Sequence, residues 1–380
     1  MRIATILLTV CLAAGTAAAQ RRQFAAVNDG TPEGRLLLEI GGEQDNAKKI
    51  ALLEDFAGKY PQHEGLPWVL DQMVAAYAQA GQHNKALEAG ARLLALDPED
   101  VVTAHACLKA AEAAKNPDLI LKWSETTSEI AHRVAAKPKP ANEDEEDWRR
   151  RVDYARQVDV YTEYSLFAAM LQTADPKKRA QLGEALERRN PASQYLPQMA
   201  EQRFLAYAQA GEGAKAIELA ERSIERNQAS VEMLLAVADL SRGKKQSDRA
   251  IALSKQAIAA AEARPKPDGV AETDWQTWRV QTTGRAHWIA GMTYAAQGQY
   301  AAADQELRAA LPGLKGQNEV LGEALFNLGL VNAKMADAGQ LERARDALRF
   351  FSQCAATPNR NQATASKNVN ALKAQYRGLR

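Results

Sequence analysis

The chain has 380 residues, of which 46% are hydrophobic and 25% charged, and its formal net charge at pH 7 is +1. This near balance argues against a general binder of nucleic acid or of an anionic membrane, because such proteins carry a basic stripe. The length would ordinarily indicate two or three globular domains, unless the chain consists of repeats, which extend a fold without needing one large core.

The first nineteen residues have the features of a secretory signal. Arg2 precedes an apolar stretch from Ile3 to Ala14, and small residues follow up to Ala19. This stretch is shorter than the about 20 apolar residues of a permanent membrane helix, and no later segment supplies one. We therefore expect removal of residues 1–19 and an exported protein, periplasmic or secreted, with no membrane span.

Residues 20–35 are predicted to be disordered. They contain Asn, Asp, Gly, Thr and Pro and have too little apolar content to pack against a core.

An internal repeat of about 130 residues organises most of the remaining chain. Leu66 to Arg92 and Leu196 to Arg222 share a Leu-Pro start and the string AYAQAG at an offset of 130 residues. Two proline-rich stretches, Lys137 to Pro140 and Arg264 to Pro267, are each followed by a Trp eight residues after the last proline. We infer that an ancestral unit was duplicated in tandem.

Each unit divides into helix pairs that resemble the tetratricopeptide repeat family, whose repeat is about 34 residues long. Residues 67–100 carry the family's large apolar residues, late Tyr, turn Gly, helix B Ala and closing Pro as Leu70, Met73, Tyr77, Gly81, Ala86, Leu93 and Pro98. The usual helix B aromatic is replaced by Gly90. Three further stretches repeat the pattern, namely 197–230, 284–315 and 322–358. Three others have the length of a pair but match weakly, namely 101–135, 144–190 and 231–263.

Further helices are predicted outside the strong repeats. Asn46 to Tyr60 is predicted to be a single helix, and Ala363 to Tyr376 a closing helix. Two long helices are predicted after the proline-rich stretches, from about Glu143 to Gln172 and from about Val270 to Gln297. Because they exceed a standard repeat helix in length, they should project beyond the stack.

The resemblance implies an all-α fold, a right-handed α-solenoid of stacked helix-turn-helix repeats with about six to seven pairs and capping helices. We predict a first unit over residues 36–195 and a second over 196–317, the latter a tandem duplicate of 66–195. A final repeat and a C-terminal capping helix are predicted over 318–380.

The sequence contains no catalytic or metal-binding pattern of useful specificity. Its five histidines lack metal-ligand spacing, and there is no nucleophile elbow, Gly-rich phosphate loop or CxxC motif. We therefore expect no enzymatic activity, no metal and no cofactor. Cys107 and Cys354, the two cysteines beyond the signal, are predicted to be buried thiols.

In the tetratricopeptide family, partners lie against helix A residues as extended or helical peptides. Carried over to this sequence, the resemblance places Arg285 among the helix A lining positions and implies partner-binding positions at Trp68, Trp288, Met292, Phe326 and Leu330. The last four form an apolar, aromatic stretch that we expect to receive an amphipathic or aromatic-rich peptide. The alternative is that these side chains pack on neighbouring repeats.

The predicted function is a non-catalytic scaffold that holds a protein or peptide partner, without nucleic acid or a small-molecule cofactor. The alternative is a self-associating structural component of a cell-envelope assembly.

Overall fold

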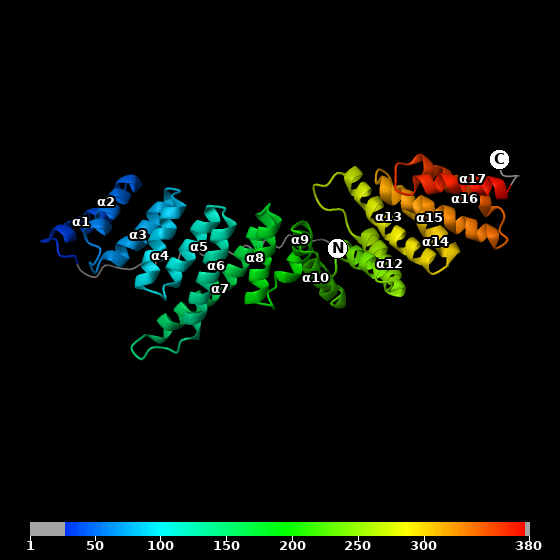
Figure 1. Ribbon diagram of the computed structural model, residues 1–380. Helices are drawn as coiled ribbons and strands as arrows, with labels where there is room; N and C mark the ends of the chain where they lie inside the picture. Colours follow the sequence, from blue (N-terminus) through cyan, green and yellow to red (C-terminus); the bar gives the residue numbers. More distant parts are fainter. Residues whose placement is uncertain (1–26, 377–380) are drawn as a thin grey trace. The chain divides into compact units, whose positions relative to one another are not determined.

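The computed structural model describes residues 27–376, and every regular element in this range is a helix (Figure 1). Contacts divide the chain into two compact units that meet between Leu196 and Pro197. From the sequence, the second unit was predicted to begin at residue 196 and the final repeat at residue 318. None of the described helices is long and apolar enough to cross a membrane.

The described part of unit 1, from residue 27 on, contains four helix pairs. Their bounds are α1 Pro32–Gly42, α2 Asn46–Lys59, α3 Leu66–Gln79, α4 His83–Leu96, α5 Val101–Ala113, α6 Pro117–Ala136, α7 Glu145–Gln172 and α8 Pro176–Arg189.

Unit 2 contains four more pairs, a 3₁₀ turn and a closing helix. Their bounds are α9 Leu196–Gln209, α10 Gly213–Glu225, α11 Val231–Gly243, α12 Ser247–Ala263, α13 Glu272–Ala296, α14 Tyr300–Ala310, η2 Leu311–Leu314, α15 Asn318–Asp337, α16 Arg343–Ala356 and α17 Gln362–Gln375.

Helices pack on their neighbours in chain order within each unit. The first helix of one pair also contacts the first helix of the next, as α3 contacts α5, α5 contacts α7, and α11 contacts α13. This is the arrangement of stacked helix-turn-helix repeats, in which each pair buries one face against the next. The predicted all-α class of stacked pairs is therefore confirmed. The described residues contain eight pairs, against the six to seven expected.

The additional pair arises at the N-terminal end, where the predicted disorder of residues 20–35 is wrong for its last four residues. Helix α1 begins at Pro32, and the Thr31 side chain caps it by accepting a hydrogen bond from the Gly34 backbone N–H at 3.1 Å. Leu37 and Ile40 are buried and anchor this helix in the core. They lie beyond residues 20–35, whose low apolar content was the basis of the predicted disorder. Residues 1–26, including the predicted signal, lie outside the described residues.

The Leu-Pro starts of the duplicated stretches begin helices of equal length. Helices α3 and α9 both have 14 residues and begin at the Leu-Pro pair, and α2 and α8, also 130 residues apart, both have 14 residues. The inferred duplication thus also includes the preceding helix, which is α2 in one copy and α8 in the other.

The turns explain why some repeats match the family pattern weakly. Gly81 and Gly298 adopt the left-handed backbone, with φ of 70° and 73°, as a tight helix stop requires. In two of the three weak stretches the same conformation falls on a lysine, with φ of 51° at Lys115 and 59° at Lys245. The turn geometry persists although the glycine is missing.

Gly90, the departure from the family pattern in the first strong repeat, is explained by close packing. A Cβ at this position would stand 2.1 Å from the Sγ of Cys107, so that α4 and α5 approach too closely for any side chain there. Cys107 and Cys354 are both free and buried, as predicted.

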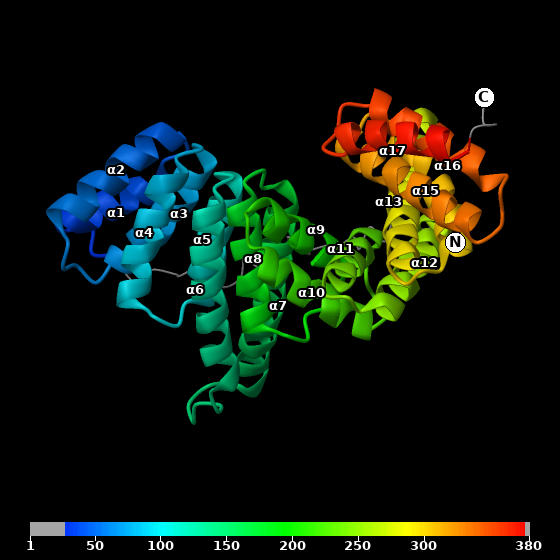
Figure 2. The same ribbon diagram turned by 45° about the vertical axis from the view of Figure 1, so that its right-hand side comes forward.

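The hairpin of α6 and α7 extends beyond α5 and α8 within unit 1 (Figure 2). This confirms for α7 that the long helix projects. Its acidic start is locally satisfied: Asp144 accepts hydrogen bonds from the backbone N–H groups of Glu146 and Asp147, and Arg149 pairs with Glu145 at 2.9 Å. Helix capping and local ion pairs therefore account for the acidic run.

Candidate partner-binding surface

The structure separates the five predicted binding positions into buried and accessible ones. Trp288 is only 7% exposed, which favours for this residue the alternative that it packs on a neighbouring helix, and its role in binding stays a prediction. Its ring lies under the guanidinium of Arg242, whose Cζ is 4.8 Å from the ring centroid. The end of helix α11, which sequence reasoning left weakly defined, covers this side chain.

The remaining positions are partly accessible. Phe326 is half-buried and packs edge-to-face on the buried Phe351, with ring centroids 5.5 Å apart. Met292 and Trp68 are half-buried, and Leu330 is exposed. Helices α13 and α15 are in contact, so Met292 and Leu330 belong to neighbouring helices of unit 2, whereas Trp68 belongs to unit 1. Their role in binding stays a prediction.

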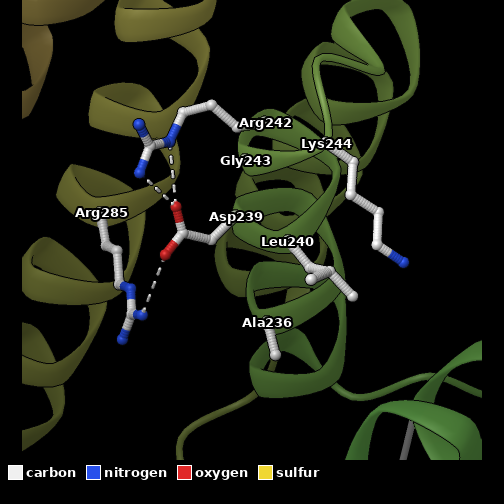
Figure 3. Close-up of a pocket in the computed structure, with 7 residues that line it drawn as sticks. All are labelled: Ala236, Asp239, Leu240, Arg242, Gly243, Lys244 and Arg285. Carbon is white, nitrogen blue, oxygen red and sulfur yellow. Dashed lines mark hydrogen bonds and ion pairs between the residues drawn. The ribbon is translucent and has the colours of Figure 1, made fainter.

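An open pocket of about 660 Å³ lies beside Trp288, between α11 and α13 (Figure 3). It is lined by Ala236, Asp239, Leu240, Arg242, Gly243, Lys244 and Arg285. Ala236 and Leu240 give it an apolar wall, Asp239, Arg242 and Lys244 lie at the end of α11, and Arg285 comes from α13.

Two arginines from different helices converge on one carboxylate in this pocket (Figure 3). Arg242 donates from Nε and Nη2 to Oδ1 of Asp239 at 3.0 and 2.8 Å, and Nη2 of Arg285 lies 4.0 Å from the other oxygen. Arg242 is also fixed by its contact with the Trp288 ring. Three cationic side chains against one carboxylate leave the pocket with a surplus of two positive charges.

Sequence reasoning found only part of this pocket. The family pattern placed Arg285 among the helix A lining positions, but Asp239 and Arg242 were missed because residues 231–263 match the pattern weakly. A usable signal was the Asp–Arg spacing of three residues near the end of α11, which favours a helical ion pair.

A second polar cluster, in unit 1, resembles a catalytic triad in composition only. Asp159 accepts from Ser128 Oγ at 2.5 Å and lies 2.6 Å from Nε2 of His132. The carboxylate thus stands between the hydroxyl and the imidazole, so the histidine cannot take the serine proton. Among residues 27–376, no group of three or more His, Cys, Asp and Glu side chains could hold a metal ion.

Unit 1 also holds a half-buried histidine, His105, beside two tyrosine rings. His105 Nδ1 lies 3.1 Å from the Tyr154 hydroxyl, and its ring packs 5.1 Å from that of Tyr161. Burial, assisted by the nearby Lys109, lowers the pKa of His105 from 6.5 to about 4.

This lowered pKa predicts a loss of stability in acid. The unfolded chain takes up a proton on His105 below pH 6.5 whereas the folded chain does so only near pH 4, so stability should fall across this window. We expect His105→Phe to remove up to about 3 kcal/mol of this acid-dependent loss. Urea unfolding of both proteins at pH 7.5, 5.5 and 4.5 checks this; parallel pH profiles would contradict it.

Two solved structures of helical-repeat proteins align with most of this chain at low sequence identity. No family model matches the chain, and no curated protein matches it. Among solved structures, the TPR domain of P58(IPK) aligns over 91% of this chain and 99% of that one, with 9% identity and a TM-score of 0.26. Yeast Tom70 aligns over 92% of this chain and 97% of that one, with 11% identity and a TM-score of 0.22. The fold assignment rests on the helix pairing seen in each unit.

Proposed function

We propose that the chain is a non-catalytic protein-interaction scaffold, and that the pocket between α11 and α13 receives an acidic segment of a partner protein. The observation that carries this proposal is the surplus of positive charge beside an apolar wall. Export, as predicted from residues 1–19, would place this interaction in the periplasm or outside the cell.

The two arginines have different roles in this proposal. Arg242 is held by Asp239 and by the Trp288 ring, which makes it a fixed donor. The Arg285 side chain is 57% exposed, and at 4.0 Å its ion pair with Asp239 is long. It can therefore turn toward a carboxylate of the partner. An arginine can bind such a carboxylate through two parallel hydrogen bonds, and Lys244 at the rim adds electrostatic attraction.

A displayed peptide library selected on the mature chain tests the proposal. We expect enrichment of peptides with Asp or Glu next to small apolar residues, and about tenfold weaker binding when those acids become Asn or Gln. Arg285→Ala should weaken the selected peptides to a similar degree. Arg349→Ala is the matched control, because Arg349 has a 52% exposed side chain, also pairs with an Asp, and lies in the same unit.

Two results would contradict this function. Selection of peptides without acidic residues would remove the pocket from the proposal. A concentration-dependent oligomer in light scattering, with no peptide enriched, would instead favour the self-associating structural component of an envelope assembly.

A further inference from the structure

We propose that helix α7 carries a second docking surface, separate from the pocket in unit 2, for an amphipathic helix of a partner protein. The surface is the α7 stripe, which consists of Val160, Tyr164, Phe167 and Leu171. Val160, Tyr164 and Leu171 are 52%, 46% and 50% exposed, and Phe167 is half-buried. Large apolar side chains at this exposure are gathered on one helix face here and are not scattered singly over the surface.

The spacing of the α7 stripe matches a helix as its occupant. Its residues follow one another at intervals of four, three and four, which is the heptad spacing of the seam between two packed helices. An occupant with apolar residues at the same spacing would insert its side chains between those of α7. An extended strand, with side chains repeating every two residues, would not keep this register.

The rings of the α7 stripe are held in place from the side. Phe167 stacks on Tyr195, with ring centroids 5.1 Å apart and an interplanar angle of 22°, and Tyr164 contacts the same ring at 6.1 Å. Tyr161 contacts Tyr164 from the other side at 6.0 Å. Aromatic anchors that are ordered before binding lose little conformational freedom when a partner docks.

The charges around the α7 stripe are satisfied within the chain. Lys109 pairs with Glu112 at 3.4 Å, Glu112 accepts from the Tyr161 hydroxyl at 2.8 Å, and Arg156 pairs with Asp153 at 3.6 Å. The border therefore presents opposite charges in matched pairs. An occupant that complements it is apolar on its docking face and carries no net charge there, in contrast to the acidic segment proposed for unit 2.

The size of the α7 stripe favours a single helix over a second copy of this chain. From Val160 to Leu171 the helix rises about 17 Å, and with a width of about 10 Å it presents about 170 Å² in projection. A stable dimer needs about 800 Å² per partner, far more than this face offers. Two heptads of helix match its length.

The equivalent helix of the duplicated unit lacks this surface. At the offset of 127 residues, Tyr164 corresponds to Gly291 of α13 and Leu171 to Gly298 in the turn after that helix. Gly291 packs so closely on Leu307 that a Cβ there would stand 2.7 Å from its side chain. The large residues of α7 therefore do not serve a contact that both copies of the unit share.

Binding of a model peptide to the mature chain tests this proposal. The probe is a synthetic, fluorescently labelled three-heptad helix with Leu at the a and d positions and neutral Gln and Ser elsewhere; a scrambled peptide of the same composition is its control. We expect saturable binding in fluorescence anisotropy, and about tenfold weaker binding to a Val160→Gln, Leu171→Gln double variant. Leu96→Gln is the matched variant, because Leu96 lies in the same unit, is 54% exposed and is outside the stripe.

Each remaining outcome decides against the proposal. Equal binding of the scrambled peptide, or unchanged affinity of the double variant, would show that heptad spacing on α7 is not recognised. A dimer that dissociates in the double variant would identify a second copy as the occupant. Arg285→Ala should leave peptide binding on α7 unchanged, so failure of this proposal and failure of the pocket in unit 2 are distinguishable.

Discussion

Gly313→Ala is expected to lower the free energy of unfolding by about 3 kcal/mol or more, because it forces apart two segments of backbone. A Cβ on Gly313 would stand 2.2 Å from the carbonyl oxygen of Val280 and 2.8 Å from the Cα of Gly284. Neither atom belongs to a side chain that could turn away. The turn η2 would have to separate from α13, on which it packs.

Urea unfolding followed by circular dichroism measures this effect. Gly213→Ala provides the control: Gly213 begins helix α10 and a Cβ there would meet nothing within 4 Å. Because alanine narrows the conformations of the unfolded chain, this variant should be unchanged or more stable by up to about 1 kcal/mol. A Gly313→Ala protein as stable as the control would show that η2 does not need this close approach.

Trp288→Ala is expected to cost about 3–5 kcal/mol of stability, since it empties a buried site in unit 2. Trp288 is 7% exposed and supports Arg242, which in turn holds Asp239. The substitution should therefore also weaken acidic peptides selected on the pocket.

Thermal unfolding and peptide binding, measured on the same variants, separate the two effects. Leu330→Ala is the comparison, because Leu330 is 39% exposed and should cost less than about 1 kcal/mol. Trp288→Phe keeps a ring under Arg242 and should recover much of the stability. If the Trp288→Ala variant has the same unfolding temperature as the native chain, the packing role assigned to this side chain is wrong.

The fold was predictable where a local pattern determines it. The turn at Gly81 requires a left-handed backbone, and Ala86 permits the close helix crossing, so the strong repeats could be placed from sequence. Lys115 and Lys245 adopt the same backbone without the glycine signal, so the pairs that contain them matched the family pattern only weakly. Helix α1 was missed because the apolar residues that anchor it follow its polar cap.

The candidate sites were less predictable because they depend on packing between repeats. Sequence could assign Trp288 to a helix A lining position, but not show that Arg242 from α11 lies on it. The exposure of Leu171 likewise depends on where α8 and the loop to Tyr195 lie. The heptad spacing of the α7 stripe could be recognised in the sequence, but the same spacing is equally typical of a buried helix face.

The two buried thiols give the molecule an internal reporter of opening. Cys107 belongs to unit 1 and Cys354 to unit 2, and each is 0% exposed. A thiol reagent reaches either sulfur only when the surrounding helices separate. Labelling of the native protein with a thiol reagent, followed by mass spectrometry, can therefore measure the rate at which each unit opens. No cysteine needs to be introduced for this measurement.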